Sequence, residues 1–407
     1  MRVIVLGGGL LGVASAYYLQ QLGHEVTVID RHAAPAAKAR GMASAPARLP
    51  PSATPERSLC STAIDGLRRR LRRVSGYLTG TRHRPAARLE HMVRLATYSR
   101  ETVHELRQEA GVSQDLRSAG WMRIYTDAKA FESFSHNVRR LQALGCSLQL
   151  LSPEEALGIE PALGHLRGQI AGAAFTPEDT SRDPAAFAAS LAFMCRAAGV
   201  RFLMNHSVVR LHARDGRIDH VELANVDGER SMLRADAYVL ALGTGSVPHA
   251  QALGIAMPLR RVREYRIELP IQNAARAPQV MLNDRTERLR IHRIETPQGE
   301  RLRVCCTVRL ATDAQDLPDS THYARMLARV ETLLPGVVDP THAEFSSTLH
   351  ARSASGMPLI GRTPLRNLFL NTAPGAQGWV NACGAGKSIA RIVSGLSPEV
   401  EFAFAKG

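Results

Sequence analysis

The sequence predicts an α/β fold in which a parallel, helix-covered sheet is interrupted by a second, β-rich α+β domain. Three observations point to this class: a strand, tight turn and helix at the N-terminus, similar segments in the middle and near the C-terminus, and strand-rich stretches between them. At 407 residues the chain exceeds the size at which one hydrophobic core usually keeps growing, and its 45% hydrophobic content is ordinary for globular proteins. We therefore expect two closely packed domains.

The first thirty-two residues predict a nucleotide site. The aliphatic run RVIVLG is typical of a strand, and LLGVASAYYLQQLG places apolar residues at helical spacing. Between them, Gly7, Gly9 and Gly12 form G-x-G-x-x-G, in which the glycines allow a turn, a close approach to pyrophosphate and helix–strand packing. Asp30 ends a second strand, EVTVID, about 20 residues later, where an acid binds ribose hydroxyls. This Rossmann-like pattern disfavours NADP and leaves NAD and FAD open.

The remaining elements alternate between the two domains. We expect a helix over 86–110, strands at GWMRIYT and CSLQLL around a helix, a helix over DPAAFAASLAFMCRAAG, a hairpin turning at DG, and a buried strand in ADAYVLALGTGS. Residues 257–310 are strand-rich, with one face formed by Arg263, Tyr265, Ile267 and Leu269. The Ala-, Pro- and Ser-rich stretch 33–57 predicts a loop. The expected domains are 1–85 plus 171–250 plus 340–407, and 86–170 plus 251–339.

One basic cluster contributes five positive charges to the net charge of +14. Its members are Arg68, Arg69, Arg70, Arg72 and Arg73. Such a cluster can bind an anionic lipid surface or an acidic partner, or can form a solvated face; nucleic acid is disfavoured because no nucleic-acid motif accompanies it.

The cysteines and the hydropathy pattern indicate a cellular location. The six cysteines show no C-x-x-C spacing, which predicts reduced thiols and no metal site. Because no apolar run is long enough to span a bilayer and the chain opens on a core strand, we expect a cytoplasmic protein.

A set of motifs in one order resembles a known family. Besides the N-terminal segment, the set comprises HMVRLATYSRETVHELR, EPAL, AGVRFLMNHSVVRL, ADAYVLALGTGS, GMPLIGRTPLRNLFLNT and GWVNACGAGK. Together they resemble FAD-dependent oxidoreductases of the D-amino-acid oxidase superfamily, most closely the bacterial D-amino-acid dehydrogenases. The resemblance implies a glutathione-reductase type of FAD domain. It also implies cofactor contacts at Gly7, Gly9, Leu10, Leu11, Gly12, Asp30, Arg31, Val209, Gly243, Gly361, Gly375, Gln377, Gly378 and Trp379.

The resemblance implies oxidative deamination of an amine or amino acid to a 2-oxo acid and ammonia, with electrons passing to a membrane quinone. Such an enzyme needs a cation for the substrate carboxylate, usually Arg. The family's arginine position holds His350, with Arg352 two residues on and therefore on the same strand face. The family's K-G-Y tyrosine is Tyr265, preceded by Glu264. We expect Tyr265, His350 and Arg352 to form the substrate site.

Other positions depart from the family. KARGMASAPA replaces its flavin-lining motif, Pro374 replaces a histidine, and Cys305-Cys306 replaces a Gly-Gly pair; we expect the two cysteines to be packing residues. Two alternatives thus stay open: a non-catalytic or partner subunit that retains the flavoprotein fold, and a binding protein that uses the arginine cluster. Tyr265 could equally be a core tyrosine with a satisfied hydroxyl.

Overall fold

The computed structural model describes residues 1–35, 85–110, 120–177, 184–310, 318–353, 358–372 and 381–400. The arginine cluster of 68–73 and nearly all of the predicted 33–57 loop lie outside these ranges. Among the described residues, no helix combines the length and the apolar character needed to cross a bilayer.

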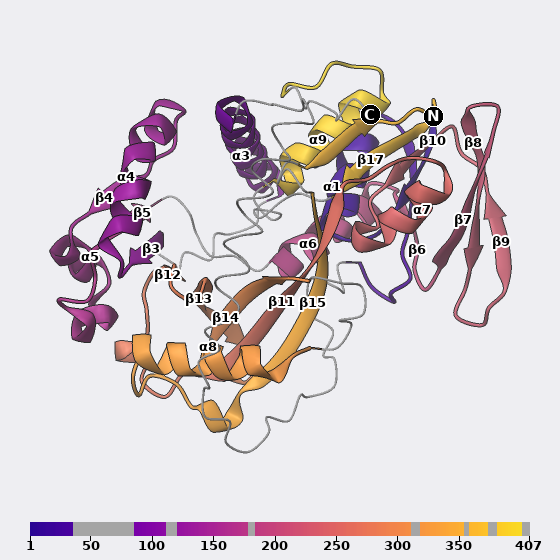
Figure 1. The fold of residues 1–407 in the computed structure, drawn as a ribbon. Helices are drawn as coiled ribbons and strands as arrows, with labels where there is room; N and C mark the ends of the chain where they lie inside the picture. The colour runs from indigo at the N-terminus through magenta and orange to yellow at the C-terminus, as the bar shows by residue number, and fades with distance from the viewer. Residues whose placement is uncertain are drawn as a thin grey trace.

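A six-stranded sheet forms the first layer of the fold (Figure 1). Its strand order is β16 (Leu359–Arg362), β17 (Leu368–Thr372), β10 (Ala237–Leu240), β1 (Arg2–Leu6), β2 (Glu25–Ile29) and β6 (Arg201–Leu203). All neighbours pair in parallel except β16 with β17. Strands β10 and β17 are buried throughout, which is typical of parallel strands covered on both faces.

Helices pack on one face of this sheet. They are α1 (Leu10–Gln21), α3 (Pro85–Ala110), α6 (Pro184–Ala197) and α9 (Ala382–Val393). Helices α1 and α9 approach closely because Gly386 faces Ala14: a Cβ on Gly386 would lie 2.7 Å from the Ala14 carbonyl carbon. The helix predicted over 86–110 is confirmed, and its Leu106 is buried in the core of this domain.

The other face carries a three-stranded antiparallel sheet of β7 (Ser207–Arg214), β8 (Arg217–Ala224) and β9 (Arg230–Leu233). Its apolar side chains share a core with β1 and β10. The predicted DG turn is confirmed, since Asp215 and Gly216 both have positive φ (52° and 73°), as a type I′ hairpin requires. The short η3 (Gly243–Gly245) and α7 (Ser246–Ala252) follow β10.

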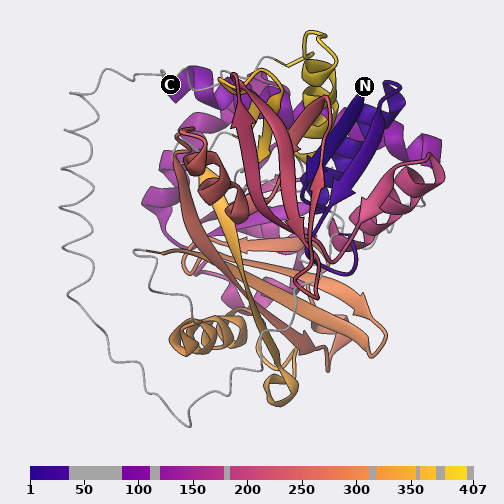
Figure 2. The same ribbon diagram turned by 90° about the vertical axis from the view of Figure 1, so that its right-hand side faces the viewer.

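An eight-stranded sheet forms the second domain. Its order is β15 (Glu344–Ser353), β11 (Leu259–Pro270), β14 (Gly299–Arg309), β13 (Leu289–Thr296), β12 (Met281–Asp284), β3 (Trp121–Tyr125), β5 (Gly172–Thr176) and β4 (Gln149–Leu151). Its helices are α4 (Ala128–Ala143), α5 (Pro153–Ile159) and α8 (Ser320–Leu333), with short 3₁₀ turns η2 (Pro161–Leu166), η4 (Ala274–Arg276) and η5 (Pro340–His342). Helix α8 covers one face, and Figures 1 and 2 show the six-stranded domain on the other side.

Sheet membership divides the chain differently from the expected boundaries in three places. Helix α3 packs with the six-stranded domain, whereas β5 and β15 belong to the eight-stranded sheet. The expected boundaries at 171 and 340 placed both strands in the nucleotide domain. Each strand begins a segment that returns to that domain, and the sequence pattern alone does not show which sheet it joins.

Candidate cofactor and substrate site

The glycine-rich turn after β1 is built by packing against its neighbours. Gly7 has φ +115°, and a Cβ there would lie 2.4 Å from the Ala241 carbonyl oxygen. At Gly12 a Cβ would lie 1.7 Å from the Gly7 carbonyl oxygen. The first and third glycines of the motif are therefore required by the fold itself.

Gly9 differs, because a Cβ there would meet no protein atom within 4 Å. It is the N-cap of α1, and no side chain caps the first turn, which contains Leu10 and Leu11. Free backbone N–H groups and the positive end of the helix dipole thus adjoin open space. A pyrophosphate is the group that this arrangement accommodates.

Asp30 follows β2 beside the same turn. Its Oδ2 accepts a 2.7 Å hydrogen bond from the Gly8 N–H, and its Oδ1 accepts one of 2.9 Å from the His32 N–H. His32 Nδ1 also lies 2.7 Å from Oδ1. The carboxylate is therefore held at the turn, next to the exposed Arg31.

Val209 lies at a β-bulge in β7. The β7–β8 register shifts between Val208 and Arg210, so Val209 has no opposite residue in the ladder, and it is exposed. A bulge leaves backbone polar groups unpaired. These groups are suited to bind the edge of a nucleobase, as the family resemblance implies for this position.

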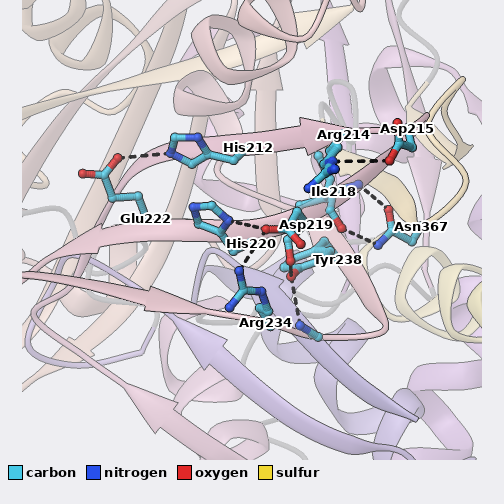
Figure 3. A network of polar contacts seen from close by, with 11 residues as sticks. His212, Arg214, Asp215, Ile218, Asp219, His220, Glu222, Arg234, Tyr238 and Asn367 are labelled. Carbon is cyan, nitrogen blue, oxygen red and sulfur yellow. Dashed lines mark hydrogen bonds and ion pairs between the residues drawn. The ribbon is translucent and has the colours of Figure 1, made fainter.

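The sheet that carries Val209 is tied to the six-stranded sheet by a polar network (Figure 3). The Asn367 side chain accepts from the Ile218 N–H (2.7 Å) and donates to the Ile218 carbonyl (2.9 Å), and the Tyr238 hydroxyl donates to the Asp219 carbonyl (3.3 Å). The Asp219 carboxylate contacts His220 and Arg234, and these hydrogen bonds lower its pKa to about 2. The network holds the bulge in a defined place.

Two further glycines predicted to contact the cofactor have positive φ. Gly243 (φ +61°) begins η3, and its carbonyl accepts a 3.5 Å hydrogen bond from Thr372 at the end of β17. Gly361 (φ +135°) is buried in β16, opposite Leu370. The remaining predicted positions, Gly375, Gln377, Gly378 and Trp379, and the neighbouring Pro374, lie outside the described residues.

The structure divides the three predicted substrate residues between the two faces of the eight-stranded sheet. Tyr265 is 2% exposed and faces α8, where its ring packs against Tyr323 and its hydroxyl accepts a 3.1 Å hydrogen bond from the Asp319 N–H. The predicted alternation is confirmed, since Arg263, Ile267 and Leu269 are buried as well. Tyr265 thus fits the alternative of a core tyrosine with a satisfied hydroxyl, and the structure does not bring it together with His350 and Arg352.

His350 and Arg352 share the other face, as their spacing predicted. Register places His350 opposite Val262 and Arg352 opposite Arg260, in strand positions that alternate with Tyr265. His350 is exposed and Arg352 is half-buried. Burial and the charge of Arg290 lower the pKa of Arg352, and Glu264 offsets part of this effect.

This face also carries a charge cluster that was not predicted from the sequence. Arg290 Nη2 donates a short hydrogen bond to Glu264 Oε2, and Arg266 Nη2 lies 3.6 Å from Glu264 Oε1. Burial opposes ionisation of Glu264, but Arg290, His350 and Arg266 outweigh it and lower its pKa. The segment REYRIE contained a signal for this cluster, because side chains alternate along a strand. Glu264 and Arg266 therefore lie on the face opposite to that of Tyr265.

Cys305 and Cys306 are separated by the same alternation. Cys305 pairs with Arg266 on the polar face, and Cys306 pairs with Tyr265 on the face toward α8. Burial raises the pKa of both thiols. Their side chains point to opposite sides of the sheet, which fits packing residues.

The polar face meets the nucleotide turn through β15. Strand β15 contacts η3, and the sheet lies between α8 and the six-stranded domain in Figures 1 and 2. The face that carries Arg352 is therefore turned toward the glycine-rich edge. Open space at Gly9, the uncapped α1 and the unpaired Val209 fit a dinucleotide such as FAD lying along this edge.

Comparison with known proteins agrees with this geometry. A family model described as "DAO: FAD dependent oxidoreductase" matches residues 2–392. A D-amino acid dehydrogenase of Methylobacterium sp. (strain 4-46) is 34% identical over 98% of this chain and 97% of its own length. One from Rhizorhabdus wittichii is 34% identical over 98% of both chains.

Solved structures share the fold. L-proline dehydrogenase from P. horikoshii superposes with a TM-score of 0.73 at 17% identity, covering 98% of this chain and 94% of its own. Glycine oxidase from Bacillus cereus gives 0.70 at 18% identity, covering 97% and 95%. The chain belongs to the DAO family of FAD-dependent oxidoreductases, and FAD is its cofactor.

Proposed function

We propose that this flavoenzyme oxidises an amino acid to a 2-oxo acid and ammonia by way of the imino acid, with Arg352 binding the substrate carboxylate. The observation that carries the proposal is Arg352 itself. It is a half-buried cation on the face turned toward the nucleotide edge, and no acid among the described residues forms an ion pair with it. The curated relatives named D-amino acid dehydrogenase support a D-amino acid as the substrate.

Bound FAD supplies the acceptor for the hydride from the substrate's α-carbon. The chain's own contribution is orientation. Arg352 can bind a carboxylate through two parallel N–H groups, which fixes both the position and the rotation of the substrate. His350, two residues away on the same face, can donate a further hydrogen bond.

Anaerobic reduction of the flavin by a panel of D- and L-amino acids tests the proposal. At least one amino acid should bleach the flavin. Arg352→Ala should slow the reduction at least tenfold without changing the flavin spectrum, because loss of a charge-assisted partner costs about 2–5 kcal/mol. Arg352→Lys, which keeps the charge but loses the planar fork, should retain part of the rate.

Two outcomes would contradict this assignment. An Arg352→Ala enzyme with wild-type rate and substrate affinity would place the carboxylate anchor elsewhere. A wild-type flavin that no amine reduces would instead favour the non-catalytic or partner-subunit alternative.

We further propose that the electrons leave to a membrane quinone, and that the Arg68–Arg73 cluster attaches this cytoplasmic protein to the inner face of the membrane. The support is the charge of the cluster, since each basic residue near an anionic surface contributes about 1 kcal/mol and is screened by salt. Replacing the five arginines by Gln should weaken binding to phosphatidylserine vesicles. Equal binding by both proteins would exclude this role.

A further inference from the structure

The polar face of the eight-stranded sheet carries more positive charge than its acids balance. By register, seven arginines of β11, β13, β14 and β15 lie on it: Arg260, Arg266, Arg290, Arg301, Arg303, Arg309 and Arg352. Its acids in these strands are Glu264, Glu268 and Glu344, and Glu344 pairs with Arg301 at 3.1 Å. Glu268 pairs with Arg303 at 2.8 Å, and Glu264 is shared by Arg290 and Arg266.

The excess cations are partly shielded from water. The side chains of Arg266 and Arg290 are 14% and 38% exposed, and Arg352 is half-buried. Arg266 Nε is buried with no hydrogen-bond partner. Partly buried charges are normally paired, so an uncompensated group of this kind indicates an anionic ligand.

The α-carboxylate of an amino acid is not enough to neutralise the excess positive charge of this face. Arg301 and Arg303 have their own acids, and Arg260 and Arg309 are exposed to water. Binding of an α-carboxylate at Arg352 therefore leaves Arg266 and Arg290 against the single acid Glu264. Arg290 is the more accessible of the two, with 38% of its side chain exposed, and its charge acts on Arg352. Arg303 is paired with its own acid, Glu268. This pair lies far from Arg352 along β11, because Glu268 is eight residues from Arg260, the residue opposite Arg352.

We propose that the substrate is a dicarboxylic amino acid, with its α-carboxylate at Arg352 and its second carboxylate at Arg290. This proposal rests on the amino-acid oxidation proposed above and specifies its substrate class. The second carboxylate undergoes no chemistry. It supplies the anion that the shared Glu264 does not, and an uncharged side chain would leave Arg290 and Arg266 competing for one acid.

Matched substrates test the proposal with the flavin-loaded enzyme. Glutamate and glutamine, and aspartate and asparagine, differ only in the charge of the side chain, and both enantiomers of each should be compared. We expect the acid to reduce the flavin with at least a tenfold higher kcat/KM than its amide. Arg290→Gln should bring this ratio close to one, and Arg290→Lys should restore part of it.

Arg303→Gln is the control variant, because it removes the same charge from the same face at a position already paired with Glu268. It should leave the acid-to-amide ratio within about twofold of wild type. If Arg303→Gln changes the acid-to-amide ratio as much as Arg290→Gln does, the preference comes from the overall positive charge of the face and not from a carboxylate site. That result would overturn the assignment to Arg290.

An equilibrium measurement separates recognition from catalysis. Glutarate has two carboxylates but no amine, and its monoamide has one carboxylate. Glutarate should perturb the flavin spectrum at a Kd at least tenfold lower than the monoamide, and Arg290→Gln should abolish this difference.

Equal rates for acids and amides in the wild type would overturn the dicarboxylate proposal while leaving amino-acid oxidation intact. If no amino acid reduces the flavin, oxidation itself fails, and glutarate binding still reports whether the anion site exists.

Discussion

Gly9 and Gly12 belong to one motif but serve different purposes. Gly12 makes room for the Gly7 carbonyl, so it serves the fold, whereas the space at Gly9 borders no protein atom. Sequence spacing identified both glycines without distinguishing these roles, because the difference depends on where the neighbouring strands lie.

This difference predicts opposite effects of alanine. Gly9→Ala should leave the melting temperature of the FAD-free protein unchanged but weaken FAD binding, since the added methyl group occupies space left for the ligand. Gly12→Ala should lower the melting temperature even without FAD, because its Cβ would overlap a backbone oxygen. Thermal denaturation and FAD titration of both variants check this, and equal melting temperatures for the two FAD-free variants would contradict it.

Tyr265 illustrates a residue whose type was retained but whose surroundings decide its role. Tyr265→Phe should lower the free energy of unfolding by about 1 kcal/mol, because the exposed Asp319 N–H loses one hydrogen bond and can turn to water. The KM for substrate should not change. Urea denaturation and steady-state kinetics test the two statements, and a raised KM at unchanged stability would return Tyr265 to the substrate site.

At the scale of single elements, the alternation of side chains between the two faces of β11 was predictable from the sequence. The charge cluster that forms on one of these faces was not. The sequence indicated that Arg263, Tyr265, Ile267 and Leu269 share one face of the strand, and all four are buried in the structure. The opposite row becomes a charge cluster only because β14 and β13 bring Arg303 and Arg290 beside it. The register between such separate segments depends on side-chain packing across the whole sheet and is not encoded in any one strand's pattern.

The three-stranded sheet provides a pH-dependent element. The folded-state pKa of Asp219, about 2, lies below the ordinary aspartate value of 3.8, so its contribution to stability is present above pH 4 and is lost as the pH falls toward 2. Asp219→Asn should therefore destabilise the protein near neutral pH, and this difference should shrink between pH 4 and pH 2. Urea denaturation of both proteins across that range measures it, and a constant difference would show that the contacts of the Asp219 carboxylate with His220 and Arg234 do not contribute.

At the scale of the whole molecule, the length of the chain and the interleaved strand and helix segments predicted the two-domain architecture, and the first and middle segments do share the six-stranded sheet. The sequence did not show that β5 and β15 would cross to the other sheet. Three large cores result: one lies between the eight-stranded sheet and α8, and the other two cover the two faces of the six-stranded sheet. Strands β11 and β15 link the two domains, since β15 contacts η3.

Separate cores predict separate responses to ligands. The described residues predicted to contact FAD belong to the six-stranded sheet, its turns and the β7 bulge, so FAD at 100 times its Kd should stabilise that domain by about 2.7 kcal/mol. The eight-stranded domain should gain little until a dicarboxylate such as glutarate binds Arg352 and Arg290.

Two signals can follow the two domains separately. Trp121 in β3 is one of two tryptophans, so in a Trp379→Phe protein its fluorescence reports on the eight-stranded sheet. Release of the flavin reports on the other domain. With FAD alone the urea midpoints of the two signals should differ, and glutarate should raise the Trp121 midpoint. If the two urea midpoints coincide and FAD raises both, β11 and β15 couple the two domains into one cooperative unit.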